Sequence, residues 1–161
     1  MSILIYAEYA EGKFKKAAFE LASYAKKVAE SLGTTVTAVT INAGDVSELS
    51  KYGVDKVLKV NNDKLSGFTA KAYADVIKQA AQKENIKLLL LSSTTDSVYL
   101  SSLVAVALEA GYASNVVGLP VSTSPFQVKR TAFSNKAFMI TEINTAVKVL
   151  GLAKNSYGIS E

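Results

Sequence analysis

Five polar residues, Ser92-Ser93-Thr94-Thr95-Asp96, follow the most continuous apolar run of the sequence, Lys87 to Leu91. Hydroxyl groups and free backbone N–H groups at the start of a helix can bind an anion such as a phosphate group. In the alternative interpretation, Asp96 caps the helix and the hydroxyl residues form a polar turn. We favour the capping interpretation, because a carboxylate at the positive end of a helix repels a phosphate.

The sequence contains neither cysteine nor histidine, which excludes Ser-His-Asp and Cys-His pairs, thiolate metal sites and imidazole ligands. Two pairs of carboxylates, Glu8 with Glu11 and Asp45 with Glu48, lie in an expected loop and at an expected helix start, where acids are common. A Ser/Lys nucleophile pair stays open, since both residue types are too frequent to be informative. The sequence thus predicts no catalytic residue, no metal site and no enzymatic activity.

Glycine-rich phosphate loops are absent from the positions where an α/β fold carries them. The loop after the first expected strand reads AEYAEGK, so Gly12 stands alone. A lone Gly-Lys pair is no P-loop, because the backbone cradle needs an upstream glycine and a Ser or Thr after the lysine. We therefore predict no cofactor-binding residue in this chain.

The net charge of +4 is mild, and the lysines are spread along the chain. Nucleic-acid binding needs a concentrated basic stripe, so we expect no nucleic-acid partner. The single arginine, Arg130, lies in the same alternating register as Phe126, Val128 and Ala132. An arginine in an apolar register needs an acidic partner or a polar interface, which singles out this strand.

The first two thirds of the chain alternate short apolar, β-branched runs with segments of helical periodicity. This alternation favours a parallel sheet with helices on both faces. In the last helix we expect a buried face formed by Leu100, Leu103, Val104, Ala107 and Leu108. The expected strands are 2–7, 35–41, 56–60 and 87–91, and the expected helices are 14–32, 45–52, 69–81 and 96–108, with caps at Asp45, Thr69 and Asp96 and a stop at Gly111.

The final third alternates apolar and polar residues and carries Pro120 and Pro125, which favours an antiparallel β-meander over 116–119, 126–133, 137–143 and 146–152. Phe126, Phe133 and Phe138 are candidates for a partner surface, although a core position is the default for an aromatic. The predicted fold class is a three-layer α/β domain, Rossmann-like or adenine nucleotide alpha hydrolase-like, with a mostly parallel sheet and a C-terminal antiparallel meander. With 161 residues, the chain suits one domain, 1–161.

The N-terminal stretch, MSILIYAEYAEG, enters a strand directly and shows no signal or transit pattern. No apolar run approaches the ~20 residues that a membrane-spanning helix needs. We therefore expect a bacterial, cytoplasmic protein without membrane insertion.

Several collinear motifs resemble the N-terminal domain of the electron transfer flavoprotein alpha subunit. They are ILIYAEYAEGKFKKAAFEL, KYGVDKVLKVNND, FTAKAYADVI, KLLLLSSTTDSVYLSSLVAVALEAGYASNV and VKRTAFSNKAFMITEI. Two departures stand out: Ser97-Val98-Tyr99-Leu100 replaces the family's usual Gly-Arg-Asp-Leu, and Arg130-Thr131 replaces its Arg-Pro. Arg130 and the turn residues Asn135 and Lys136 carry over by position.

The resemblance implies a scaffold domain that docks a beta subunit and a C-terminal flavin domain, with Arg130, Asn135 and Lys136 at the interface. It also implies FAD in the full-length subunit, held outside this chain, and dehydrogenases as partners of the intact complex. The alternative is a stand-alone adenine-nucleotide-binding module of the universal-stress-protein type. The missing late glycine-rich phosphate loop counts against that alternative.

Overall fold

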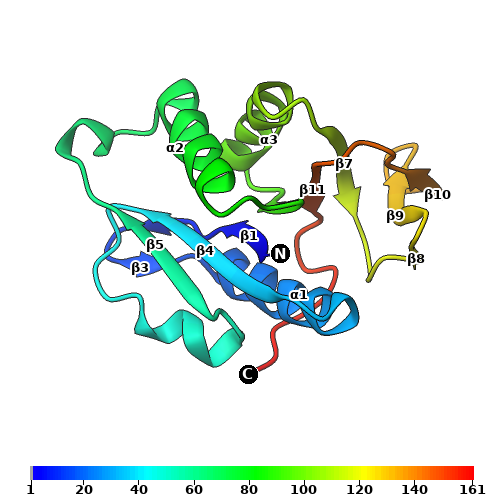
Figure 1. Ribbon diagram of the computed structural model, residues 1–161, viewed down its shortest axis with the longest axis horizontal. Helices are drawn as coiled ribbons and strands as arrows, with labels where there is room; N and C mark the ends of the chain where they lie inside the picture. Colours follow the sequence, from blue (N-terminus) through cyan, green and yellow to red (C-terminus); the bar gives the residue numbers. More distant parts are fainter. Residues whose placement is uncertain (1) are drawn as a thin grey trace.

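A computed structural model describes residues 2–161 and shows a twisted sheet with helices on both faces (Figure 1). The helices are α1 (Lys16–Leu32), α2 (Ala70–Lys83) and α3 (Thr95–Ala107), with short 3-10 helices η1 (Ser47–Tyr52) and η2 (Asp63–Leu65). The main sheet contains β1 (Ser2–Tyr6), β4 (Thr35–Ile41), β5 (Lys56–Val60), β6 (Leu88–Ser92), β7 (Gly111–Val116), β8 (Ser122–Thr123), β9 (Phe126–Ala132), β10 (Ala137–Glu142) and β11 (Lys148–Leu152). A separate two-stranded hairpin pairs β2 (Tyr9–Ala10) with β3 (Lys13–Phe14).

The parallel part of the sheet confirms the predicted fold class. Strand order is β10-β9-β7-β11-β6-β1-β4-β5, and β1 pairs in parallel with both β4 and β6. From β1 the chain runs to β4 and β5 on one side and then returns to β6 on the other. The strand order therefore reverses between β1 and β6.

Two apolar layers hold the helices to the sheet. Helix α1 packs on one face, where Leu21 and Val28 join Ile3, Ile5 and Leu90 in a buried cluster. Helices α2 and α3 cover the other face (Figure 1). Side chains alternate along a strand, so successive residues of β1 and β6 pack into opposite apolar layers. Both strands are therefore apolar at nearly every position.

The antiparallel extension is confirmed for β9 and β10. The short strand β8, which pairs antiparallel with β9, was not predicted. The expected strand 116–119 coincides with the structure only at Val116, the last residue of β7. The last strand differs from the predicted meander, because β11 pairs in parallel with β6 and β7 inside the sheet. Its residues Val149 and Leu150 are both buried, one in each apolar layer. Burial on two faces is typical of a central parallel strand, and the apolar composition of this segment reflects it.

Helix α3 ends earlier than predicted, and the strand after it begins earlier. The helix stops at Ala107 with Leu108 as its C-cap, so Gly111 does not end the helix but starts β7. A Cβ atom added to Gly111 would lie 2.5 Å from Cγ2 of Ile143. The glycine is needed for this close approach, and its sequence context alone does not distinguish that role from a helix stop.

Several predicted core residues are exposed. Leu103 on α3 is 44% exposed, and Ala107 is also exposed, because α3 packs on the sheet through the face that carries Leu100 and Val104. Of the three aromatics in the antiparallel extension, Phe126 is buried, whereas Phe133 and Phe138 are exposed. No helix found within residues 2–161 has the length and apolar character to cross a membrane.

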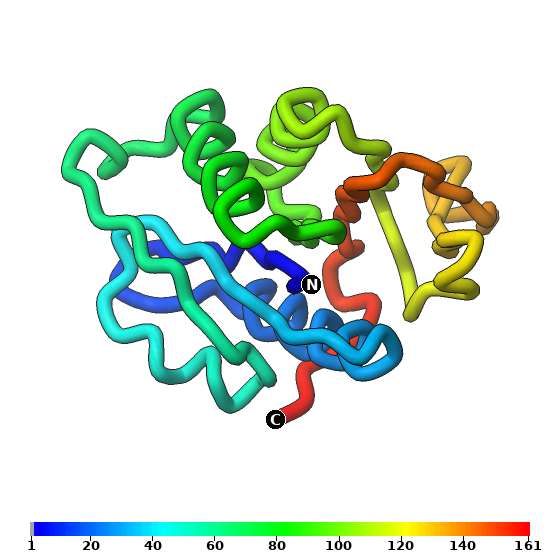
Figure 2. The backbone as a smooth tube through the Cα atoms, viewed as in Figure 1, coloured from blue at the N-terminus to red at the C-terminus, as the bar shows by residue number. Residues whose placement is uncertain are grey.

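The C-terminal segment runs back along α1, as the red end of the tube in Figure 2 shows. The carboxylate of Glu20 accepts hydrogen bonds from the backbone N–H groups of Asn155, Tyr157 and Gly158 at 3.0, 2.9 and 3.2 Å. Glu20 itself is buried. Further along the segment, Ser23 of α1 exchanges two hydrogen bonds with the backbone of Ser160. Glu20 and Ser23 thus hold residues 155–160 against the helix.

Two buried tyrosines determine the expected response to alkaline pH. Burial raises the pKa of Tyr6 and of Tyr24, and the charge of Glu8 raises that of Tyr6 further. Both phenols stabilise the fold fully below their unfolded pKa of about 10, and this contribution is lost as pH rises toward the folded pKa. We expect urea unfolding midpoints that are level between about pH 7 and 9 and fall above about pH 10. Tyr24→Phe should make that fall shallower, and an unchanged slope would assign it to other groups.

Candidate functional site

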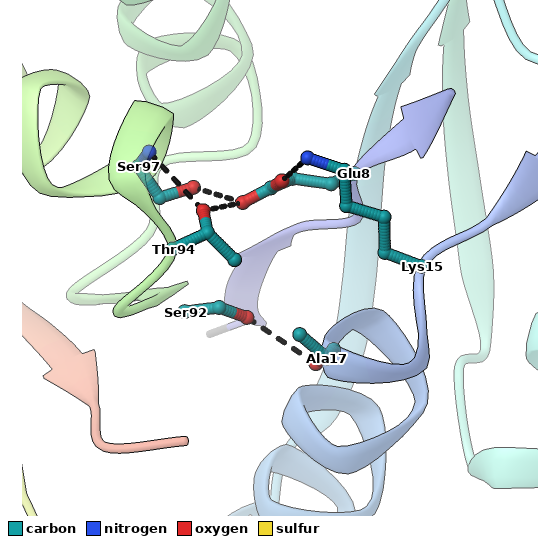
Figure 3. A network of polar contacts seen from close by, with 6 residues as sticks. All are labelled: Glu8, Lys15, Ala17, Ser92, Thr94 and Ser97. Carbon is teal, nitrogen blue, oxygen red and sulfur yellow. Dashed lines mark hydrogen bonds and ion pairs between the residues drawn. The ribbon is translucent and has the colours of Figure 1, made fainter. Parts of the chain in front are cut away.

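The position at which an α/β sheet of this kind could bind a ligand is the carboxyl edge between β1 and β6. Ligands bind such sheets where strand order reverses, outside the carboxyl ends of the strands. Two loops meet at this point, one after Tyr6 at the end of β1 and one after Ser92 at the end of β6. The Ser92 hydroxyl also donates to the carbonyl of Ala17 at 3.2 Å, which ties β6 to the start of α1 (Figure 3).

The centre of this edge is filled by the carboxylate of Glu8. Glu8 is 4% exposed, and its Oε1 accepts short hydrogen bonds from the hydroxyls of Thr94 and Ser97. Its Oε2 accepts from Nζ of Lys15 at 2.7 Å. Figure 3 shows these side chains converging from β1, from the start of α1 and from the start of α3.

Local structure explains why these residues meet. Ala7 extends β1 by donating its N–H to the carbonyl of Val39, which carries Glu8 to the carboxyl edge. The β2–β3 hairpin then folds the chain back, so that the Lys15 N–H donates to the Glu8 carbonyl at 3.0 Å. On the facing loop, Thr94 is the N-cap of α3 and accepts from the N–H of Ser97 at 3.3 Å.

The electrostatics of the edge favour this internal carboxylate. The N-terminus of α3 carries a partial positive charge that stabilises an anion beside it. The hydrogen bond from Lys15 to Glu8 raises the pKa of Lys15, so the lysine stays protonated. A carboxylate of the chain itself thus lies beside the start of α3, the kind of position at which α/β proteins can bind a phosphate.

A groove of about 580 Å³ beside this edge also lacks the groups that bind phosphate. It lies at the carboxyl ends of β1, β4 and β5, between Tyr9, Asn42 and Tyr73. The residues that line it include Glu11 and Asp63, with no lysine or arginine among them. Negative charge without a facing cation disfavours an anionic ligand.

The predicted cap of α3 is wrong. Thr94 caps the helix and Asp96 lies in its first turn. The carboxylate that opposes a phosphate is Glu8, which comes from 86 residues earlier in the chain and which the sequence assigned to a loop. The sequence feature that could have pointed to Glu8 is its position directly after a buried strand, at the edge of the sheet where the neighbouring parallel strand also ends.

The predicted interface residues all lie on the β9–β10 hairpin. Arg130 is half-buried and donates to the backbone carbonyl and the hydroxyl of Ser114 at 2.7 and 2.9 Å, so its partner is a polar residue of β7 and not an acid. Asn135 and Lys136 are exposed in the turn, where Asn135 has a φ of 64°. Arg130 faces Met139 across the ladder and so lies apart from the turn.

No group of three or more metal-binding side chains gathers anywhere in the part of the chain that the structure describes.

Comparison with known proteins identifies the family. The electron transfer flavoprotein domain model matches residues 3–160. The electron transfer flavoprotein alpha subunit of Thermoanaerobacterium thermosaccharolyticum is 32% identical over 74% of this chain and 37% of its own length. The alpha subunit of Clostridium acetobutylicum is 30% identical over 74% of this chain and 36% of its own. Subunit LctC of the lactate dehydrogenase (NAD(+),ferredoxin) of Acetobacterium woodii is 26% identical over 89% of this chain and 35% of its own.

The chain spans little more than a third of the length of these relatives. The family match covers nearly every residue, and the parallel sheet and antiparallel extension agree with the fold that the motifs implied. This chain belongs to the electron transfer flavoprotein domain family, in its alpha-subunit type.

Proposed function

We propose that this chain is the N-terminal scaffold of an electron transfer flavoprotein alpha subunit. In this role it supports FAD-mediated electron transfer from dehydrogenases by docking a beta subunit and the flavin domain, and it carries no flavin and catalyses no reaction itself. The proposal treats residues 1–161 as one domain of a cytoplasmic complex. Relatives named as electron transfer flavoprotein and lactate dehydrogenase subunits support the link to dehydrogenases.

The observation that carries the scaffold role is the filled carboxyl edge between β1 and β6. A chain that matches the family from residue 3 to 160 holds its own Glu8 carboxylate where a nucleotide phosphate would bind. Binding energy for the flavin must then come from residues outside this chain. In this proposal the role of the chain is to provide docking surfaces for its partners. We assign the β9–β10 hairpin, with Arg130, Asn135 and Lys136, to the beta subunit.

A thermal-shift titration with FAD, AMP and ATP tests the first half of the proposal. We expect no change in Tm with any of the three and no flavin absorbance in the purified protein. A nucleotide that binds would stabilise the fold by about 2.7 kcal/mol at a hundredfold excess over its Kd. Such a shift would contradict the scaffold role and favour the adenine-nucleotide module.

Co-expression with a tagged beta subunit tests the second half. We expect the two chains to copurify, and we expect Arg130→Glu to weaken this association, because the substitution reverses charge on the hairpin and breaks the bonds to Ser114. Lys51→Glu, an exposed charge reversal far from the hairpin, is the matched control. Equally strong copurification of the wild type and both variants would indicate that the interface lies elsewhere on the molecule.

A further inference from the structure

Strand β10 forms one of the two edges of the main sheet, and β5 forms the other. Strand β10 pairs with β9 on one side and with no strand of the described residues on the other. Within it, Phe138 is 63% exposed, Met139 48% and Ile140 53%. The strand carries no proline, no lysine and no bulge, which are the features that natural proteins use to prevent edge pairing. An apolar edge of this kind is a template for another strand.

The hydrogen bonds to β9 show which residues of β10 offer free backbone groups. The N–H of Ile143 donates to the carbonyl of Phe126 at 3.0 Å, in register with the β9–β10 ladder. Hydrogen-bonded pairs alternate along antiparallel strands, so every second residue counted back from Ile143 points its backbone groups at β9. The intervening residues, Phe138 and Ile140 among them, point their N–H and C=O groups at the open edge.

We propose that two copies of this chain form a two-fold dimer in which β10 pairs antiparallel with β10 of the second copy, centred on Met139. In this register Phe138 lies opposite Ile140 of the second copy, and each such pair exchanges both outward backbone hydrogen bonds. The same register places Lys136 opposite Glu142 of the second copy. Apolar side chains therefore meet apolar ones, and opposite charges meet at both ends.

Neighbouring registers lose this complementarity. A two-fold axis at Ile140 would set Phe138 opposite Glu142, and an axis at Phe138 would set Ile140 opposite Lys136. Both arrangements place a charged side chain against an apolar one. An odd shift would set inward-pointing residues opposite outward-pointing ones and lose the hydrogen bonds. The sequence of this edge thus selects one self-pairing.

The paired surface is small compared with the ~1,600 Å² of a standard interface, so the dimer belongs to the weak, concentration-dependent class. It is independent of the proposed function, although both use the β9–β10 hairpin. A beta subunit that docks on the same hairpin would compete with the second copy and dissociate the dimer.

Sedimentation equilibrium between about 10 µM and 1 mM tests the proposal. We expect the average mass to rise from 17.1 kDa toward twice that value as concentration increases. Ile140→Pro removes an N–H that points at the open edge and none that β9 uses, so the monomer folds and dimerisation weakens at least about tenfold. Ile140→Lys should act similarly, whereas Val106→Lys, at an apolar site on α3 that is even more exposed, should leave the dimer unchanged.

Charge reversal tests the register itself. Lys136→Glu and Glu142→Lys should each weaken the dimer, because each places like charges opposite one another. The double variant should recover wild-type dimerisation. A protein that stays monomeric at every concentration, or a dimer that none of these changes affects, overturns the proposal. If the protein is monomeric at every concentration but still binds a beta subunit, the dimer proposal is overturned and the proposed function is left intact. Circular dichroism confirms that each variant is folded.

Discussion

Replacing Glu8 by alanine is expected to lower the free energy of unfolding by about 3 kcal/mol. The substitution leaves the hydroxyls of Thr94 and Ser97 without their acceptor at a buried site, at about 1 kcal/mol or more for each. It also removes the ion pair with Lys15. The lysine side chain is 41% exposed and regains water, so the loss of the pair adds less than a fully buried one would. Urea unfolding followed by circular dichroism measures the change.

Glu11→Ala is the matched control for this prediction. Glu11 lies three residues further along the same loop, but it is exposed and makes no ion pair among the described residues. Its substitution should change stability by less than about 0.5 kcal/mol. Lys15→Met should cost less than Glu8→Ala, because it leaves both hydroxyl bonds to Glu8 in place. Equal effects of the Glu8 and Glu11 variants would show that the buried network contributes nothing to stability.

Local pattern was enough to predict the parallel half of the sheet. The segments that became β1 and β6 are apolar at nearly every position, and β4 is rich in β-branched residues, which is typical of strands buried on both faces. The helices between them follow from periodicity, because α1 buries residues three and four apart, such as Leu21, Ala25 and Val28. These features lie within one segment each and can be read without knowing the neighbours.

Pairing partners could not be predicted in the same way. β11 is apolar enough for a central strand, but its position between β6 and β7 depends on contacts with segments up to about sixty residues away. Its neighbours along the chain were antiparallel candidates, and this favoured a meander. The exposure of Phe138 could not be predicted for a related reason. Phe138 lies in a strand pattern, and only the strand order of the sheet shows that its strand is an edge strand.

In the candidate site, too, the local structure could be predicted from the sequence, whereas the long-range contact could not. The sequence predicts a helix start in the hydroxyl-rich loop after β6, with the capping interpretation favoured over an anion site, and α3 does begin there. The anion is Glu8, and its arrival depends on β1 and β6 being neighbours in parallel register. An exposed loop carboxylate and a buried carboxylate that accepts hydrogen bonds from a distant loop have the same local sequence, so only the fold distinguishes them.

The C-terminal segment offers a second large effect, through Glu20. Its carboxylate accepts three backbone hydrogen bonds from residues 155–158 and is itself 6% exposed. Hydrogen bonds to an ionised acceptor are worth about 1.5 kcal/mol or more each, but part of that value returns when the released N–H groups meet water. We expect Glu20→Ala to lower the free energy of unfolding by about 2–3 kcal/mol. Glu20→Gln keeps an acceptor oxygen and should fall between wild type and alanine.

Hydrogen exchange separates release of this segment from global unfolding. In Glu20→Ala we expect the amides of Asn155, Tyr157 and Gly158 to lose their protection, while Leu90 in the central strand stays protected until the whole domain opens. Glu30→Ala is the control, because Glu30 lies on the same helix but pairs only with the exposed Lys27, a contact worth about 0.2–0.5 kcal/mol. Protection that persists at all three amides in Glu20→Ala would mean that the segment is held by its apolar contacts, such as the edge-on packing of Tyr157 against Tyr24, and not by the carboxylate.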